Sequence, residues 1–315
     1  MYDWIGRWTG MDGSSPGETK PFFFRMMSNL PSGPAFWLCA AAAGMLYVMQ
    51  RPLRRRLLRN AQELFEPASP RENRRIVKHY CRNLAVAMYE ILFLSAKLGK
   101  REDGWNPIRE AHGEEHLEQA LSEGKGAIVY LPHVGNFFVY YWYLMGRYNC
   151  TTVATASSNE LRPLYRRFAE LGCRGFDYDE TNPIQLMRSL RDHLKQGGVV
   201  YLLGDFYRPN FPEATLFGRK THLPQGAAML ALQYEVPIVP MTGRGIGRFA
   251  HRLQFEPPIR LSDRFRKNEL RAASDLLNQW MEQSIRRHPD SWFYLFQAEE
   301  RWCEPAPSNP IQGGA

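Results

Sequence analysis

From His112 onward, the 315-residue chain alternates short apolar runs with segments of helical pattern. Short runs without polar interruption are typical of strands that helices cover on both faces. The alternation therefore predicts an α/β fold with a central, mostly parallel or mixed sheet flanked by helices. The predicted strands are 126–131, 151–155, 199–203, 237–241 and 251–255, and the predicted helices are 114–123, 134–147, 159–171, 183–195, 224–234 and 270–287.

The region before this alternation is helical and partly apolar. Residues 34–50 read PAFWLCAAAAGMLYVMQ, which is shorter than the roughly 20 residues of a usual spanning helix. RPLRRRLLR follows directly, with five arginines. An apolar helix beside an arginine cluster can lie in one leaflet while the cluster contacts anionic head groups. The alternative is a core helix followed by a solvated basic one; we favour the membrane surface.

The remaining N-terminal sequence completes the predicted domain organisation. Residues 70–98 show helical spacing, with Ser69 as N-cap and Pro70 at the first helical position. We expect a poorly ordered segment over 1–30, a helical membrane-associating region over 31–100, one α/β domain over 101–304 and a disordered tail over 305–315.

Charge and cysteine content indicate which cellular compartment and which binding partners suit this chain. Forty Lys and Arg against 32 Asp and Glu give a net charge of +8, which suits phospholipid head groups, an acidic carrier protein, a phosphorylated cofactor or nucleic acid. The basic residues are spread out and form no recognised module, so nucleic acid is not expected. Five scattered cysteines without CxxC spacing predict reduced thiols facing the cytosol. The N-terminus lacks the pattern of a cleaved signal peptide.

The segment LPHVGNFF, residues 131–138, holds the strongest local signal. His133 follows a predicted buried strand, and in α/β folds chemistry collects at the carboxyl ends of strands. Taken alone, a histidine that only caps the strand end is an equal alternative.

Two blocks resemble the lipid A late (lauroyl/myristoyl) acyltransferases, in the lysophospholipid acyltransferase superfamily. EEHLEQALSEGKGAIVYLPHVGNFF resembles the stretch around the family's HxxxxD/E motif. GDFYRPNFPEATLFGRKTHLPQGAAMLALQYEVPIVPMTGR resembles its second block, and the likeness covers residues 36–302. It implies a glycerol-phosphate-acyltransferase-like fold without cofactor or metal, at the cytoplasmic face of the inner (plasma) membrane, peripheral or monotopic. The co-substrate would be an acyl thioester of phosphopantetheine, on acyl carrier protein or coenzyme A.

In this family a histidine base removes a proton from a hydroxyl or amine acceptor, and a carboxylate orients the histidine. His133 matches the base, but Phe138 stands where Asp or Glu is expected. Three explanations compete: a catalytically silent lipid- or carrier-binding relative, another orienting carboxylate from Asp205 or Glu160, or an amine-type acceptor that needs only His133. We favour retained activity.

The resemblance also implies substrate-binding positions. Asn136 remains from the motif, and Phe138 would line the acceptor pocket. Asp205 matches a strand-end aspartate of the family, although a turn cap is an equal alternative. Arg208 and Arg219 fall on loops around the donor and acceptor, where plain surface charge is the alternative. Arg166 and Gly226 would contact a phosphate, or for Gly226 the carbonyl oxyanion.

Other motif matches lack the context that their chemistry needs. GSSPG at 13–17 fits GxSxG, but no strand precedes it. HGEEH at 112–116 differs from the HExxH zinc pattern, and no phosphate-binding glycine loop occurs. We therefore expect no metal site.

Overall fold

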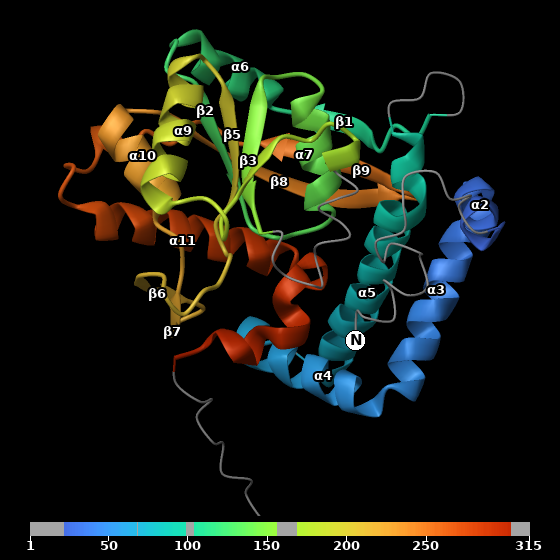
Figure 1. Ribbon diagram of the computed structural model, residues 1–315. Coiled ribbons are helices and arrows are strands. Elements are labelled where there is room, and N and C mark those ends of the chain that lie inside the picture. Colours follow the sequence, from blue (N-terminus) through green and yellow to red (C-terminus); the bar gives the residue numbers. More distant parts are fainter. Residues whose placement is uncertain (1–21, 68, 99–103, 156–168, 304–315) are drawn as a thin grey trace, which may run out of the picture.

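A seven-stranded sheet forms the centre of the computed structural model, which describes residues 22–67, 69–98, 104–155 and 169–303 (Figure 1). Neighbouring strands are parallel except β8 and β9, which are antiparallel. The predicted α/β class with a mixed sheet is therefore confirmed. The strand order is β1 (Ile108–His112), β9 (Ala250–Phe255), β8 (Ile238–Gly247), β2 (Ala127–Leu131), β5 (Val199–Leu203), β3 (Cys150–Ala154) and β4 (Gly175–Asp177).

Side chains of the central strands alternate between two hydrophobic clusters, as the two-residue period of a strand requires. On β2, Ile128 and Tyr130 belong to one cluster, while Ala127, Val129 and Leu131 belong to the other. The first cluster lies under α9 (Pro183–Lys195), α10 (Gly226–Tyr234) and α11 (Leu270–Arg287), and the second under α6 (Glu114–Ser122) and α7 (Phe137–Met145) (Figure 1).

Most predicted elements lie within a few residues of the observed ones, and three differences matter. The helix predicted from residue 134 begins only at Phe137, because Gly135 has a φ of +68° and Asn136 caps the helix. Most of the predicted helix 159–171 lies outside the described residues. Strands β1 and β4 and the hairpin of β6 (Glu213–Leu216) and β7 (Arg219–His222) were not predicted, since they are short and rich in polar residues.

From residue 22 onward, four N-terminal helices of the described chain stand beside the sheet: α2 (Phe22–Asn29), α3 (Ser32–Met49), α4 (Arg51–Phe65) and α5 (Pro70–Tyr89). The side chain of Ser69 caps α5 as predicted, accepting from the Glu72 backbone amide. A π-helical turn (Glu90–Leu94) and a 3-10 turn (Ser95–Lys97) continue α5. Residues 22–29 were expected to be poorly ordered and are helical instead; 1–21 and 304–315 lie outside the described part.

Helix α3 lies at the edge of the molecule, with α5 between it and the sheet (Figure 1). It buries only Ala35, Cys39 and Ala43, while Trp37 is 68% and Met49 is 69% exposed. Helix α3 has 18 residues, and by length and composition alone it is long and apolar enough to cross a membrane.

The basic helix α4 exposes only part of its arginine cluster. Arg51, Arg55 and Arg59 are exposed at four-residue spacing, which puts them on one face. Arg54 donates to the Tyr47 carbonyl, and Arg56 pairs with Glu299 and Glu300.

The C-terminal part returns to the sheet through short helical turns: Leu261–Asp263 before α11, then Pro289–Ser291 and Phe293–Arg301 after it. These last turns lie against α4, α5 and the loop after β2.

Candidate active site

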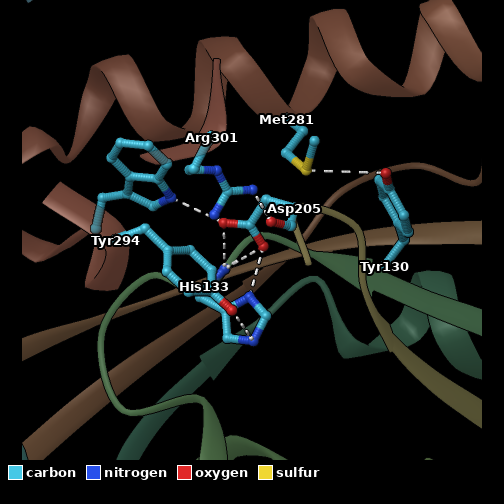
Figure 2. A network of polar contacts seen from close by, with 7 residues as sticks. Tyr130, His133, Asp205, Met281, Tyr294 and Arg301 are labelled. Atoms are coloured by element: carbon cyan, nitrogen blue, oxygen red, sulfur yellow. Dashed lines mark hydrogen bonds and ion pairs between the residues drawn. The ribbon is translucent and has the colours of Figure 1, made fainter. Parts of the chain in front are cut away.

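His133 and Asp205 occupy matching positions after two neighbouring parallel strands. β2 and β5 pair in register, so that Leu131 lies beside Leu203, the last residue of each strand. His133 and Asp205 follow them by the same interval. Asp205 is fully buried, and its Oδ1 lies 2.6 Å from His133 Nδ1 (Figure 2). The structure thus brings together the two residues that sequence analysis selected for catalysis.

Hydrogen-bond donors surround the Asp205 carboxylate and define its protonation. The His133 backbone amide lies 3.0 Å from Oδ1, and Trp292 Nε1 donates to Oδ2 at 2.8 Å. Burial raises the pKa of Asp205, but His133, Arg301 and Trp292 together hold the pKa below its usual value. The carboxylate is therefore ionised and accepts the Nδ1 hydrogen of His133. In the neutral imidazole, Nε2 then keeps its lone pair.

The C-terminal turns hold the loop that carries His133. Phe293 N donates to the His133 carbonyl at 2.8 Å, and Gly135 N donates to the Ser291 carbonyl at 2.9 Å. The ring of Tyr294 packs on the imidazole with its hydroxyl 3.5 Å from Nε2. Sequence analysis missed this segment, because nothing in its local pattern shows that it returns to the end of β2.

Asn136 belongs to a closed buried network behind the histidine. Its side-chain amide donates to Glu90 at 2.7 Å, and its backbone amide donates to the Tyr140 hydroxyl at 3.1 Å. His251 lies 2.8 Å from Glu90 through Nε2 and 3.3 Å from Tyr140 through Nδ1. Asn136 is therefore a residue that fixes the loop rather than one that lines the cavity.

A cavity of about 390 Å³ opens beside His133. Its walls are mainly apolar and come from β2, β3 and β5, the start of α7, and helices α9 and α10. Phe138 and Gly226 line it, as expected of substrate-binding residues. Phe138 is only the second residue of α7 and packs on Phe137, so it does not stand one helical turn beyond His133. Among the described residues, no serine or cysteine lines this cavity and no cluster of metal-binding side chains occurs.

The predicted arginines have separate positions. Arg208 pairs with Asp179 at 2.9 Å and donates to Thr155, which lines the cavity. Arg219 does not line the cavity: it lies 3.2 Å from Glu63 and stacks on Trp302, so its contact with substrate stays a prediction. Glu160 and Arg166 lie outside the described residues.

The known family and the relatives that this chain resembles are acyltransferases. The family described as "Bacterial lipid A biosynthesis acyltransferase" matches residues 22–302. A phosphatidylinositol mannoside acyltransferase of Mycobacterium tuberculosis is 30% identical over 198 residues, which cover 58% of this chain and 57% of the relative. One from Mycolicibacterium smegmatis is 32% identical over 138 residues, 40% of this chain and 43% of the relative.

The chain thus spans about half the length of the curated relatives that it matches. Among solved structures, the 1-acyl-sn-glycerophosphate acyltransferase PlsC of Thermotoga maritima covers 80% of this chain and 97% of its own, at 12% identity and a TM-score of 0.37. The family match is what decides, because it covers most of the sequence: the chain belongs to the bacterial lipid A biosynthesis acyltransferase family.

Proposed function

We propose that this protein is an acyltransferase that moves an acyl group from a thioester donor to a hydroxyl or amine acceptor, with His133 as general base. The observation that carries the proposal is the 2.6 Å contact between His133 Nδ1 and the ionised Asp205. This contact fixes the tautomer that leaves Nε2 free, and it stabilises the imidazolium that forms when Nε2 takes a proton.

The apolar cavity supports the donor side of this proposal. An acyl chain gains free energy by leaving water for an apolar pocket, and His133 lies in the wall of this one. The donor is proposed to be acyl carrier protein or coenzyme A. Transfer is direct, because the described cavity wall offers no serine or cysteine for an acyl-enzyme.

Asp205 also bears on the silent alternative, a lipid- or carrier-binding relative without activity. Phe138 was the reason for that alternative, since it leaves the motif without a carboxylate. The contact with Asp205 supplies a carboxylate from another strand and favours an active enzyme. It equally removes the reason to restrict the acceptor to amines, so a hydroxyl acceptor remains a candidate, and the mycobacterial relatives are named for a phosphatidylinositol mannoside.

The exposed apolar face of α3 and the exposed arginines of α4 support a location of this protein at an anionic membrane surface. We propose that this surface is the cytoplasmic face of the inner membrane.

Hydrolysis and transfer of labelled palmitoyl-coenzyme A test the function. Purified protein is expected to release palmitate and to acylate an added lipid acceptor. His133→Ala is expected to lower both rates at least ~100-fold while the protein stays folded. Near-normal rates in that variant would remove His133 as the base, and complete absence of both activities in the wild type, with acyl carrier protein thioesters also inert, would favour the silent alternative.

A further inference from the structure

Tyr294 is the aromatic residue that faces the reactive nitrogen of His133. Its hydroxyl lies 3.5 Å from Nε2, and the two rings meet edge to face with centroids 4.8 Å apart (Figure 2). Tyr294 is 8% exposed and lines the same cavity as His133, so its hydroxyl lies close to the place where substrate would react. At 3.5 Å the contact with Nε2 is longer than an ordinary hydrogen bond. A substrate oxygen can therefore compete for this hydroxyl.

A buried cation supports the same ring. The guanidinium of Arg301 lies 4.3 Å from the centroid of Tyr294, and its Nη2 donates to the backbone carbonyl of Asp205. Arg301 is 2% exposed, and its Nε and Nη1 form no hydrogen bond within the described chain. Burying a guanidinium with unmade hydrogen bonds is costly, so the charge must be offset by the Asp205 carboxylate and the aromatic rings around it.

Chemistry beside Nε2 defines where the acyl carbonyl must lie. The acceptor oxygen has to come within hydrogen-bond distance of Nε2, and the carbonyl carbon has to be next to that oxygen. The carbonyl oxygen is then about one hydrogen-bond length farther from the imidazole than the acceptor oxygen is. It lies in the space next to the Tyr294 hydroxyl. We propose that Tyr294 is a catalytic residue that donates its hydroxyl hydrogen to the acyl carbonyl oxygen, and that Arg301 is its positioning residue. This inference rests on the proposed acyl transfer.

His133 Nε2 takes the acceptor proton as the acceptor oxygen bonds to the carbonyl carbon, and the carbonyl π electrons move onto its oxygen. The hydrogen bond from Tyr294 stabilises this oxyanion. When the carbonyl reforms, the carbon–sulfur bond breaks, and the leaving thiolate takes the proton from Nε2. Tyr294 keeps its own proton throughout.

The surroundings of Tyr294 suit a donor rather than a base. Burial raises the pKa of Tyr294, and the nearby Asp205 charge raises it further, while Arg301 opposes both. The phenol is therefore protonated at neutral pH. The guanidinium of Arg301 lies over the ring face of Tyr294 and so restricts the orientation of the ring.

A steady-state comparison of three variants with palmitoyl-coenzyme A tests the proposal. Tyr294→Phe is expected to lower kcat by about 10²- to 10³-fold with little change in KM, because the bond forms only in the transition state. Tyr207→Phe is the matched control, because the guanidinium of Arg301 also lies 5.9 Å from the centroid of the Tyr207 ring. Tyr207 is outside the described cavity wall. This variant is expected to keep kcat.

His133→Ala separates this proposal from the proposed function. Loss of activity in His133→Ala with normal kcat in Tyr294→Phe would overturn the role of Tyr294 and leave the function standing. Normal activity in His133→Ala would overturn both. Replacing Tyr294 with 3-fluorotyrosine, which keeps a hydroxyl in the same place, is expected to hold kcat within about tenfold of wild type, and a loss as large as that of Tyr294→Phe would contradict the proposal.

A double-mutant cycle tests the positioning role of Arg301. Arg301→Lys keeps a cation but not the planar stack, so kcat is expected to fall about tenfold with the wild-type tyrosine. In the Tyr294→Phe background the same change is expected to have little further effect, because the hydroxyl through which it acts is gone. Independent, multiplicative losses would overturn the role assigned to Arg301.

Discussion

The carboxylate of Glu90 accepts a hydrogen bond from the Asn136 side chain at 2.7 Å, which joins the end of α5 to the loop that carries His133. Glu90 is fully buried in the π-helical turn after α5, and turns of this kind often occur at functional sites. Helix α5 also packs against α3, whose outer face is exposed. A continuous path of contacts therefore connects the candidate membrane helix with the candidate active site.

Glu90→Gln tests how firmly this network is built. Glu90 accepts from both Asn136 and His251, whereas a glutamine offers one oxygen and one amino group. One buried donor would then lack an acceptor, so we expect a loss of about 1–3 kcal/mol in the free energy of unfolding, measured by urea denaturation. Glu63→Gln, which removes only a partly exposed ion pair, should cost less than about 1 kcal/mol. Equal losses in the two variants would show that the Glu90 network contributes no more to the free energy of unfolding than a partly exposed ion pair does.

Asp205→Asn tests the orienting carboxylate. An asparagine keeps the shape of the side chain but cannot stabilise an imidazolium at His133, and it can present its amino group to Nδ1 and favour the wrong tautomer. We expect kcat for thioester turnover to fall between about 10²- and 10⁴-fold. Asp263→Asn, at an exposed position, serves as the control for a lost carboxylate and should keep full turnover. Turnover within a few-fold of wild type in Asp205→Asn would assign the orienting role elsewhere.

The lowered pKa of Asp205 also predicts how stability depends on pH. Burial raises this pKa, but the charge and hydrogen bonds of His133 and the charge of Arg301 bring it below the unfolded value of about 3.9. The ionised form thus stabilises the folded protein above about pH 4, and this contribution is lost as the pH falls through the folded-state pKa. The difference in unfolding free energy between wild type and Asp205→Asn should be largest near neutral pH and shrink below about pH 4. A difference that stays constant across this range would mean that the pKa of Asp205 does not change on folding.

The sheet could be predicted from sequence because its central strands are short apolar runs, and the bounds of Val199–Leu203 were predicted correctly. His133 and Asp205 were candidates for the same reason, since both follow such strands. Their contact depends on which strands are neighbours, and no local pattern contains that information. Tyr294 and Arg301 were missed because the segment that carries them reaches the site only by tertiary packing.

Phe138→Glu tests whether Asp205 already orients His133 or whether the altered motif leaves His133 without a sufficient carboxylate. The helix begins at Phe137 and Nδ1 of His133 already contacts Asp205, so a carboxylate at position 138 has no orienting role to restore. It would place a charge in an apolar cavity wall instead. We expect Phe138→Glu to lower thioester turnover at least tenfold and Phe138→Leu to keep most of it. Faster turnover of hydroxyl acceptors by Phe138→Glu would show that His133 lacked a sufficient carboxylate.

Exposed side chains of α3 and α4 predict two separable parts of membrane binding. Replacing Trp37, Met45 and Met49 with glutamine removes apolar area that would enter the lipid, so co-sedimentation with vesicles of anionic phospholipid should be lost at any salt concentration. Replacing Arg51, Arg55 and Arg59 with glutamine should weaken binding mainly at low salt, because the attraction to head groups is screened within about 10 Å at 0.1 M salt.

A matched control removes the same charge from another surface. Arg264, Lys267 and Arg271 are exposed around the start of α11, so their replacement with glutamine lowers the net charge equally without touching α4. If α4 contacts the membrane, this variant should bind vesicles nearly as well as wild type at low salt, while the α4 variant should not. Equal weakening by both sets would reduce the role of α4 to net charge alone. Undiminished binding after the α3 substitutions would show that this helix is not the apolar part of the membrane contact.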